Sequence, residues 1–195
     1  MTPLPAMAQI RPAAEPDLPA ILAIYNHAIL HTTAVYDYAP HTLAMRQDWY
    51  RAKVAAGLPV LVAETGDQVV GFGSLSPFRA WAAYKYTVEN SIHIASAAQG
   101  QGLGGQMLAA LVAAAEARDY HAIVAGIDAD NAVSLHLHRR QGFEEVAHLR
   151  QVGYKFGRWL DLIFMERLLS TPDDPTELTG TTLATGLTTG LTTGK

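Results

Sequence analysis

Glycines alternate with other residues in the run from Gln99 to Gly104, which lies between a predicted strand and a predicted helix. Glycine lets the backbone turn sharply and lets a ligand approach it closely. The start of a helix adds free N–H groups and the positive end of the helix dipole. The combination predicts a loop that holds a phosphate group against the helix, in preference to a plain strand-to-helix turn.

The hydrophobic pattern on either side of this loop predicts an α+β fold. Helical spacing of apolar residues predicts helices over about 17–30, 42–57 and 131–141, and one directly after the glycines. β-rich runs predict strands over about 8–11, 60–64, 69–76, 86–94, 122–127, 144–154 and 159–168. Two helices precede the central strands, so the order is not the alternation of a doubly wound fold. We expect a mixed, mostly antiparallel sheet flanked by helices.

One folded domain is expected over residues 8–169. A chain of 195 residues with 49% hydrophobic and 16% charged residues suits a single globular domain. Beyond residue 169 the composition shifts to Thr, Gly, Pro and Leu, and Leu-Thr-Thr-Gly is repeated at Leu187 and Leu191. Such a segment buries too little apolar surface to fold alone, so residues 170–195 are expected to be a flexible Thr/Gly-rich tail.

The amino-acid composition argues against several classes of function. The formal net charge is -4, with 14 Lys and Arg against 18 Asp and Glu, so no basic excess favours a nucleic-acid partner. The chain has no cysteine, which rules out disulfides, thiolate catalysis and cysteine-ligated zinc. The first residues lack the pattern of a signal peptide, and no apolar run reaches the length of a membrane span. We therefore expect a cytoplasmic protein without a membrane partner.

The glycines also fit a competing motif. Gly100, Gly102 and Gly105 match the G-x-G-x-x-G of dinucleotide-binding folds, and Asp128 and Asp130 follow at about the distance of a ribose-binding acid. Against this, the motif lies in mid-chain, and the strand before it is polar where a doubly wound sheet is apolar on both faces. A Walker A loop is excluded because no Gly-Lys-Ser or Gly-Lys-Thr is present. An NAD-binding oxidoreductase stays as an alternative.

The same positions fit Q-x-x-G-x-G, and the segment from Ile10 to Leu168 resembles the GNAT acetyltransferase superfamily in its order of elements. Further stretches resemble more closely its phosphinothricin and methionine sulfoximine acetyltransferase branch. These stretches are Ile24 to His27, Tyr86 to Ser91, Gly126-Ile127 with Asn131 and Ser134, His138 with Gly142-Phe143, and Gln151 to Asp161. The resemblance implies an acetyl-CoA-dependent N-acetyltransferase.

The resemblance also implies where acetyl-CoA binds. In such enzymes the fourth strand splays from the fifth, and the pantetheine arm pairs with the exposed backbone like an added strand. The glycine loop holds the pyrophosphate, and an asparagine reaches the pantetheine arm. The cofactor residues implied for this sequence are Ile92, His93, Ile94, Gly100, Gln101, Gly102, Leu103, Gly104, Gly105, Asn131 and Ser134.

Glu89 matches the general base of the family. An amine nucleophile is protonated at neutral pH and must lose a proton before it attacks a thioester. A carboxylate within reach, directly or through one water, accepts that proton. Alternation along the strand places Glu89 and His93 on one face, opposite Val88, Ile92 and Ile94. Without the resemblance, a solvated glutamate at a strand edge is the simpler interpretation.

His138 matches the position from which many relatives reprotonate the departing thiolate with a tyrosine. A histidine suits the same role because its pKa lies near neutrality. The alternative is a partly buried structural histidine in a helix. His136 does not form a metal-binding pair with His138, because helical residues i and i+2 point about 200° apart. No metal site is expected.

The acceptor site is expected at the loop that leads into the catalytic strand. In the family this loop contacts the amino-acid substrate, and an arginine there suits a carboxylate as a bidentate fork. Aromatic residues would enclose the acceptor side chain, although ordinary packing explains each of them singly. The expected substrate residues are Tyr36, Arg79, Ala82, Ala83, Tyr84, Tyr86 and Glu89.

These expectations combine into one predicted function. The chain moves an acetyl group from acetyl-CoA to the α-amine of a small amino-acid analogue, of the methionine sulfoximine, methionine sulfone or phosphinothricin type. A protein N-terminal acetyltransferase, a non-catalytic acyl-CoA sensor and an NAD enzyme are the alternatives. The last hairpin, with Lys155, Arg158 and Trp159, resembles the region that helps to form dimers in the family, so a homodimer is expected.

Overall fold

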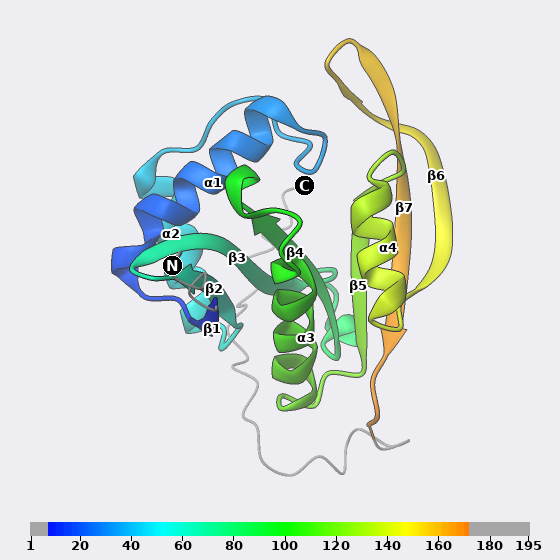
Figure 1. The fold of residues 1–195 in the computed structure, drawn as a ribbon. Coiled ribbons are helices and arrows are strands. Elements are labelled where there is room, and N and C mark those ends of the chain that lie inside the picture. The colour runs from blue at the N-terminus through cyan, green and yellow to red at the C-terminus, as the bar shows by residue number, and fades with distance from the viewer. Residues whose placement is uncertain (1–7, 172–195) are drawn as a thin grey trace, which may run out of the picture.

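A seven-stranded mixed sheet forms the centre of the protein in the computed structural model, which describes residues 8–171 (Figure 1). The strand order is β1-β2-β3-β4-β5-β7-β6, and all neighbours are antiparallel except β4 and β5. This is the mixed, mostly antiparallel sheet that the sequence predicts. The strands are β1 (Gln9–Pro12), β2 (Val60–Thr65), β3 (Gln68–Pro77), β4 (Thr87–Ile94), β5 (Ala122–Asp128), β6 (Glu144–Lys155) and β7 (Arg158–Leu168).

Helices cover both faces of the sheet. α1 (Leu18–His31) and α2 (Leu43–Ala55) pack on one face, and α3 (Leu103–Glu116) and α4 (Ala132–Arg140) pack on the other (Figure 1). Thr42 caps α2 as expected, since its hydroxyl accepts a hydrogen bond from the N–H of Met45 at 3.3 Å. Short 3-10 turns at 15–17, 82–84 and 96–98 add to the elements that the sequence predicts.

Hydrophobic clusters on the two faces hold the helices against the strands that carry the site. Phe72 of β3 packs with Ile21 of α1 on one face. On the other face, Met107 and Leu111 of α3 join a larger cluster that includes Ile123 of β5. Each of these side chains is at most 1% exposed, so the strands between the helices are firmly fixed.

The β6–β7 hairpin contacts the loop between α1 and α2. The ammonium group of Lys155 donates to the carbonyl oxygens of Thr32 at 2.9 Å and Val35 at 2.6 Å. The hydroxyl of Tyr38 donates to the carbonyl oxygen of Tyr154. These bonds join two segments that are far apart in the sequence. The two segments lie on either side of the gap between β4 and β5 that is described below.

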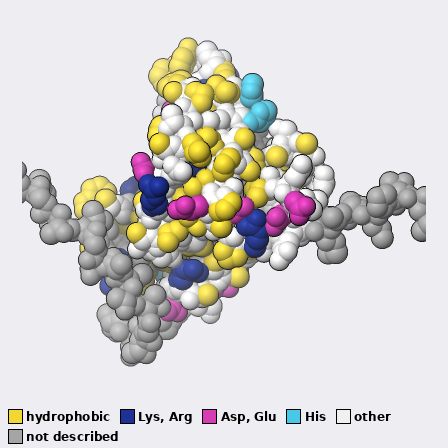
Figure 2. Space-filling model, turned by 90° about the vertical axis from the view of Figure 1, so that its left-hand side faces the viewer, with side chains coloured by type: hydrophobic (Ala, Val, Ile, Leu, Met, Phe, Trp, Pro, Cys, Tyr) yellow, Lys and Arg dark blue, Asp and Glu magenta, His cyan; other side chains and the backbone are white. Residues whose placement is uncertain are grey.

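Charged side chains of both signs are interspersed on the face shown in Figure 2, with no continuous basic area. Within residues 8–171, no helix is long and apolar enough to cross a membrane. The predicted tail lies outside the described residues except for Ser170 and Thr171.

Candidate active site

β4 and β5 separate after a short parallel pairing. Residues 87–89 pair with residues 122–124, and beyond them the two strands diverge (Figure 1). The N–H of Ala95 donates to the carbonyl oxygen of Val70, toward β3. Because hydrogen-bonding direction alternates along a strand, the N–H groups of Ile92 and Ile94 point to the side that β5 has left. The separation thus exposes backbone donors on one edge of β4.

A cavity of about 1140 Å³ opens at this separation. Its walls come from β4 beyond Glu89, the glycine loop, the start of α4 and the C-terminal half of α1. Ten of the predicted cofactor residues line this cavity, and Gln101 does not. The residues that the sequence selects as cofactor ligands therefore lie around one continuous space.

The glycine loop has the backbone conformation that requires glycine. Gly100 and Gly102 have φ values of 76° and 79°, which other residues adopt only with strain. The side-chain amide of Gln99 donates to the carbonyl oxygen of Ile94 at 3.1 Å and ties the loop to the end of β4. Gly102 is the N-cap of α3 and offers no capping side chain, so the first N–H groups of α3 are left for an anion.

Gly104 and Gly105 serve a different purpose from the two glycines before them. A Cβ atom on Gly104 would lie 3.2 Å from Cδ2 of Leu137, and one on Gly105 would lie 3.6 Å from Cδ1 of the same side chain. Small residues here let the first turn of α3 approach α4 closely. The glycine loop and the first turn of α3 together form what we call the anion cradle. The position of this cradle therefore depends on the packing of α3 against α4.

Asn131 fixes the start of α4 at the cavity wall. Its side-chain oxygen accepts a hydrogen bond from the N–H of Ser134 at 3.0 Å, and both residues line the cavity. The amide nitrogen of Asn131 makes no hydrogen bond with any residue that the structure describes, so it is available to a ligand. Together, the unpaired edge of β4, the anion cradle and this amide fit a long, anionic acyl-CoA molecule.

Glu89 lies half-buried where the cavity meets β5. Gly126 lines the cavity, and a Cβ atom there would lie 3.2 Å from Oε1 of Glu89, so the carboxylate lies against this wall. Burial raises the pKa of Glu89, while the positive charges of Arg79 and Lys53 lower it. A raised pKa makes the carboxylate a stronger base. The geometry and the electrostatics both suit a proton acceptor at this point.

His93 lies on the same face of β4 as Glu89, as strand alternation predicts. Its ring stacks on Phe72, with the centroids 5.0 Å apart, and it is 8% exposed. Burial, with a contribution from the charge of Arg46, lowers the pKa of His93 to about 4, so the ring is neutral at physiological pH. The side chain therefore belongs to the core, and only the backbone of His93 is suited to a cofactor.

His138 is 4% exposed and lines the cavity. Its Nδ1 donates to the carbonyl oxygen of Ser134 at 2.8 Å, and its Nε2 accepts from the side-chain amide of Asn90 at 2.9 Å. Burial lowers the pKa of His138. In this neutral form the single ring proton is held by Ser134, so Nε2 has no proton to give. Oδ1 of Asn90 is buried and has no hydrogen-bond partner among the described residues.

Tyr36, expected to contact the acceptor, lies outside the walls of this cavity and of the smaller one described below. Its hydroxyl lies 3.2 Å from both Oδ2 of Asp128 and the carbonyl oxygen of Asp161. A Cβ atom on Gly153 would lie 2.6 Å from Cε2 of the Tyr36 ring. These contacts join the α1–α2 loop to β5, β6 and β7, and a role of Tyr36 in acceptor binding stays a prediction.

The predicted acceptor loop lies close to Glu89 but outside the cavity walls. Arg79 is exposed, stacks on Phe78 with its guanidinium carbon 4.1 Å from the ring centroid, and acts on Glu89 through its charge. Ala82–Tyr84 form a 3-10 turn in which Tyr84 packs edge-on against Phe78. The carbonyl oxygen of Tyr86 accepts from the N–H of His121 at 2.8 Å and so holds the β4–β5 junction.

Two buried cations of α2 near the site were not predicted from the sequence. Lys53 of α2 is 7% exposed, and its ammonium group donates to Leu75 and Ser76 of β3. Burial lowers the pKa of Lys53 to about 8, and the charge of Glu89 raises it. Arg46, also on α2, is 3% exposed and borders a hollow of about 270 Å³. Cations on the apolar side of a predicted helix are the signal that would have identified both.

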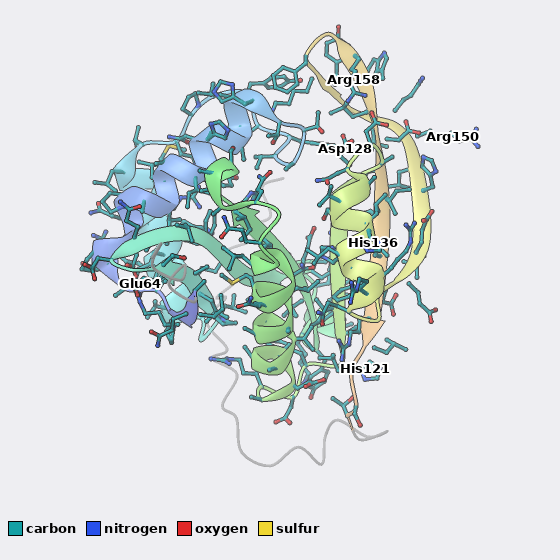
Figure 3. The ribbon with its side chains drawn as sticks, in the orientation of Figure 1. Glu64, His121, Asp128, His136, Arg150 and Arg158 are labelled. Carbon is teal, nitrogen blue, oxygen red and sulfur yellow. The ribbon has the colours of Figure 1, made fainter. Side chains whose placement is uncertain are left out.

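An ion pair lies in the wall of the larger cavity. Figure 3 shows Asp128 at the end of β5 and Arg158 at the start of β7, on the same side of the molecule. Arg158 binds Asp130 at 2.6 Å, which joins the β6–β7 hairpin to the loop before α4.

His136 is exposed on α4, whereas His138 is buried, as their helical spacing predicts. Among residues 8–171, no three His, Asp or Glu side chains are placed to hold a metal ion.

Comparison with known proteins assigns a family to this geometry. The model of the Acetyltransferase (GNAT) family matches residues 21–143. The chain is 46% identical over 170 residues to an L-methionine sulfoximine/L-methionine sulfone acetyltransferase of Pseudomonas paraeruginosa, covering 87% of this chain and 96% of that protein. It is 37% identical to a phosphinothricin N-acetyltransferase of Alcaligenes faecalis, covering 84% of each.

Solved structures agree with the sequence relatives. An acetyltransferase of Salmonella typhimurium, solved with its cofactor acetyl-CoA, superposes with a TM-score of 0.84 at 42% identity, covering 86% of this chain and 97% of that one. The splayed strands, the glycine cradle and these matches lead to the same conclusion: the chain belongs to the GNAT acetyltransferase family.

Proposed function

We propose that this chain is an acetyl-CoA-dependent N-acetyltransferase that acetylates the α-amine of a small amino-acid analogue. The proposed acceptors are of the methionine sulfoximine, methionine sulfone or phosphinothricin type, the substrates named for its relatives. The observation that carries this proposal is the position of Glu89, a half-buried carboxylate against Gly126 in the wall of a cavity that also contains an anion cradle and an unpaired strand edge.

Glu89 is the proposed general base. The acceptor enters with a protonated amine, and the carboxylate removes one proton so that the nitrogen lone pair becomes available. Burial strengthens Glu89 as a base, and the charges of Arg79 and Lys53 keep its ionised form accessible. Arg79 is exposed beside Glu89 and is the proposed partner of the acceptor's α-carboxylate.

Acetyl-CoA supplies the activated acetyl group when it is bound. Gly100, Gly102 and the first N–H groups of α3 are the proposed pyrophosphate ligands. The N–H groups of Ile92 and Ile94 are the proposed donors to the pantetheine arm and to the charge that develops on the thioester oxygen. Asn131 offers its amide from the opposite wall.

His138 remains the proposed source of the proton for the departing thiolate, and the structure defines what this role requires. Nε2 must first take a proton from solvent in the cavity, which makes the ring an imidazolium because Nδ1 keeps its proton on Ser134. The side-chain amide of Asn90, which now donates to Nε2, would have to turn away so that the new N–H faces the thiolate. The lowered pKa of His138 favours rapid release of the proton.

A homodimer in the cytoplasm is also part of the proposal. β6 is an edge strand of the sheet, and with β7 it exposes the apolar side chains Val146, Leu149, Val152, Tyr154 and Trp159. Such a row of apolar groups on an edge strand suits association with a second copy. The cytoplasmic location rests on the absence of cysteine in the sequence.

Thiol release tests the proposed function. The wild-type chain is incubated with acetyl-CoA and each of methionine sulfoximine, methionine sulfone and phosphinothricin, and free coenzyme A is measured with a thiol reagent. We expect release that depends on the acceptor. Binding of acetyl-CoA without release for any amine would instead indicate an acyl-CoA sensor. Thermal stabilisation by NAD but not by acetyl-CoA would favour the oxidoreductase alternative.

A further inference from the structure

A second, smaller hollow lies beside Glu89 on the face of the sheet covered by α1 and α2. It has a volume of about 270 Å³, and we name it the Arg46 pocket after the cation in its wall. The residues that line it include Tyr25 of α1, Arg46 and Trp49 of α2, Ser74 and Ser76 of β3, and Ser91 of β4.

The Arg46 pocket begins next to the proposed base. Ser76 is the register partner of Glu89 across the β3–β4 ladder, and Ser91 lies two residues beyond Glu89 on the same face of β4. The strand advances about 6.8 Å over those two residues. A side chain of two methylenes that ends in an S–O or P–O group brings its oxygen within hydrogen-bonding reach of groups at this distance from an α-carbon held near Glu89.

Arg46 is a buried cation without a carboxylate partner in the described part of the chain. It is 3% exposed, and its guanidinium carbon lies 4.0 Å from the ring centroid of Tyr25 and 4.6 Å from that of Trp49. One terminal nitrogen contacts Nδ1 of His41 at 3.3 Å, and Nε is buried with no hydrogen-bond partner among residues 8–171. Cation–π contacts offset only part of the cost of burying this charge.

The serines around Arg46 add further hydrogen-bonding groups. Ser74 is 3% exposed, and its hydroxyl makes no hydrogen bond with the residues that the structure describes. Ser76 and Ser91 are held in place by Lys53 and His93, respectively. A fixed cation and several hydroxyls around one small space form a site for a group that offers more than one acceptor oxygen.

We infer that the Arg46 pocket binds the oxygen-bearing end of the acceptor's side chain, a sulfone, sulfoximine or phosphinate. The inference rests on the proposed function, and it explains why that function would select these analogues. Their head groups are tetrahedral and carry at least one oxygen that accepts hydrogen bonds. A thioether of the same length offers no such oxygen, so the Arg46 and Ser74 donors would lose their water without replacement.

The test uses L-methionine sulfone and L-methionine, which differ only in the two sulfur-bound oxygens. The quantity measured is the ratio of kcat/KM for the sulfone to kcat/KM for methionine. In Arg46→Met we expect this ratio to fall by about 10- to 100-fold, the range for losing a hydrogen bond to a charged group. Arg51→Met removes an exposed arginine from the same helix and should leave the ratio unchanged.

Ser74→Ala keeps the inference testable if Arg46→Met does not fold. This small change should lower the same ratio by about 3- to 10-fold, the effect of one neutral hydrogen bond. Equal losses for both acceptors, or an unchanged ratio in every folded variant, would overturn the inference while leaving the acetyltransferase intact. A wild-type chain that releases no thiol with either acceptor would overturn the proposed function itself, and this inference with it.

Discussion

Single residues at the β4–β5 junction set the chemistry of the site. Glu89 is half-buried, and burial raises its pKa against the opposing charges of Arg79 and Lys53. None of the described residues donates a hydrogen bond to the carboxylate of Glu89, so its oxygens are available to an acceptor amine. The balance of burial and charge at this one residue therefore determines the pH range in which the site works.

Replacement of Glu89 tests its role as base. Glu89→Gln keeps the shape of the side chain but removes its ability to accept a proton. We expect kcat to fall by about 100- to 10,000-fold, the usual contribution of a general base, with acetyl-CoA affinity unchanged. Steady-state kinetics and calorimetric titration with acetyl-CoA measure the two quantities. Glu144→Gln, at an exposed position on β6, is the matched control, and an unchanged kcat in Glu89→Gln would contradict the assignment.

The positive charge of Arg79 near Glu89 predicts in which direction the pH profile of kcat/KM shifts when that charge is removed. The base works when it is deprotonated, so kcat/KM rises as pH passes upward through the pKa of Glu89. The charge of Arg79 lowers that pKa, and its loss raises it. In Arg79→Gln the acid limb of the kcat/KM profile should therefore move to higher pH. A limb that stays in place or moves to lower pH would show that Arg79 does not act on the base.

At the scale of elements, the glycine loop holds the end of β4 to the start of α3. Gly102→Ala would place a Cβ on a residue with φ of 79°, at a cost of about 1–2 kcal/mol. If the loop relaxes to avoid that strain, acetyl-CoA affinity should fall by about 5- to 30-fold, as equilibrium binding would measure.

Gly57 provides a control with the same backbone strain. Its φ is 67°, a Cβ there meets nothing within 4 Å, and it follows α2 outside the larger cavity. Gly57→Ala should therefore lose stability without losing acetyl-CoA affinity. Equal losses of affinity in both variants would mean that the glycine loop has no special part in binding.

The sequence predicted the elements well because their signals are local. Apolar periodicity located every helix and strand of the sheet to within a few residues, and the Gln99–Gly104 motif located the cradle. The GNAT family and its fold were predicted from motifs, and the family model and the relatives confirm them. Such features depend on neighbouring residues along the chain, which a single sequence records.

The acceptor side of the site was harder to predict because it is assembled from distant segments. The hydroxyl of Tyr36, for example, donates to Oδ2 of Asp128, 92 residues away in the sequence, and no local pattern predicts that contact. Arg46 of α2 and Ser91 of β4 line one pocket although they are 45 residues apart, which no local pattern records. The sequence does not distinguish an aromatic or cationic loop residue that packs against the core from one that forms an ion pair or binds a ligand. Only the tertiary arrangement distinguishes these roles.

At the scale of the whole molecule, the outer strand β6 leaves one end of the sheet open. Val152 is 54% exposed on this strand, and Trp159 on β7 is 59% exposed. We predict a dimer through this edge, since its apolar side chains and free backbone groups suit a second copy. Multi-angle light scattering measures the mass directly, and Val152→Glu should shift it toward the monomer.

A matched substitution separates this effect from a general loss of solubility. Val54 on α2 is 57% exposed and lies on another part of the surface, so Val54→Glu should leave the mass unchanged. A wild-type protein that is monomeric at micromolar concentration would contradict the predicted dimer.

The competition between a small acceptor and a peptide tests the central claim most directly. The wild-type chain is given acetyl-CoA with equal concentrations of L-methionine sulfone and a short peptide with a free N-terminal amine, and both acetylated products are quantified by mass spectrometry. From the proposed function we expect acetyl transfer to the α-nitrogen of the sulfone in about 100-fold preference to the peptide, a factor of about 2.7 kcal/mol in transition-state stabilisation. Preferential acetylation of the peptide, or no product from either, would contradict it.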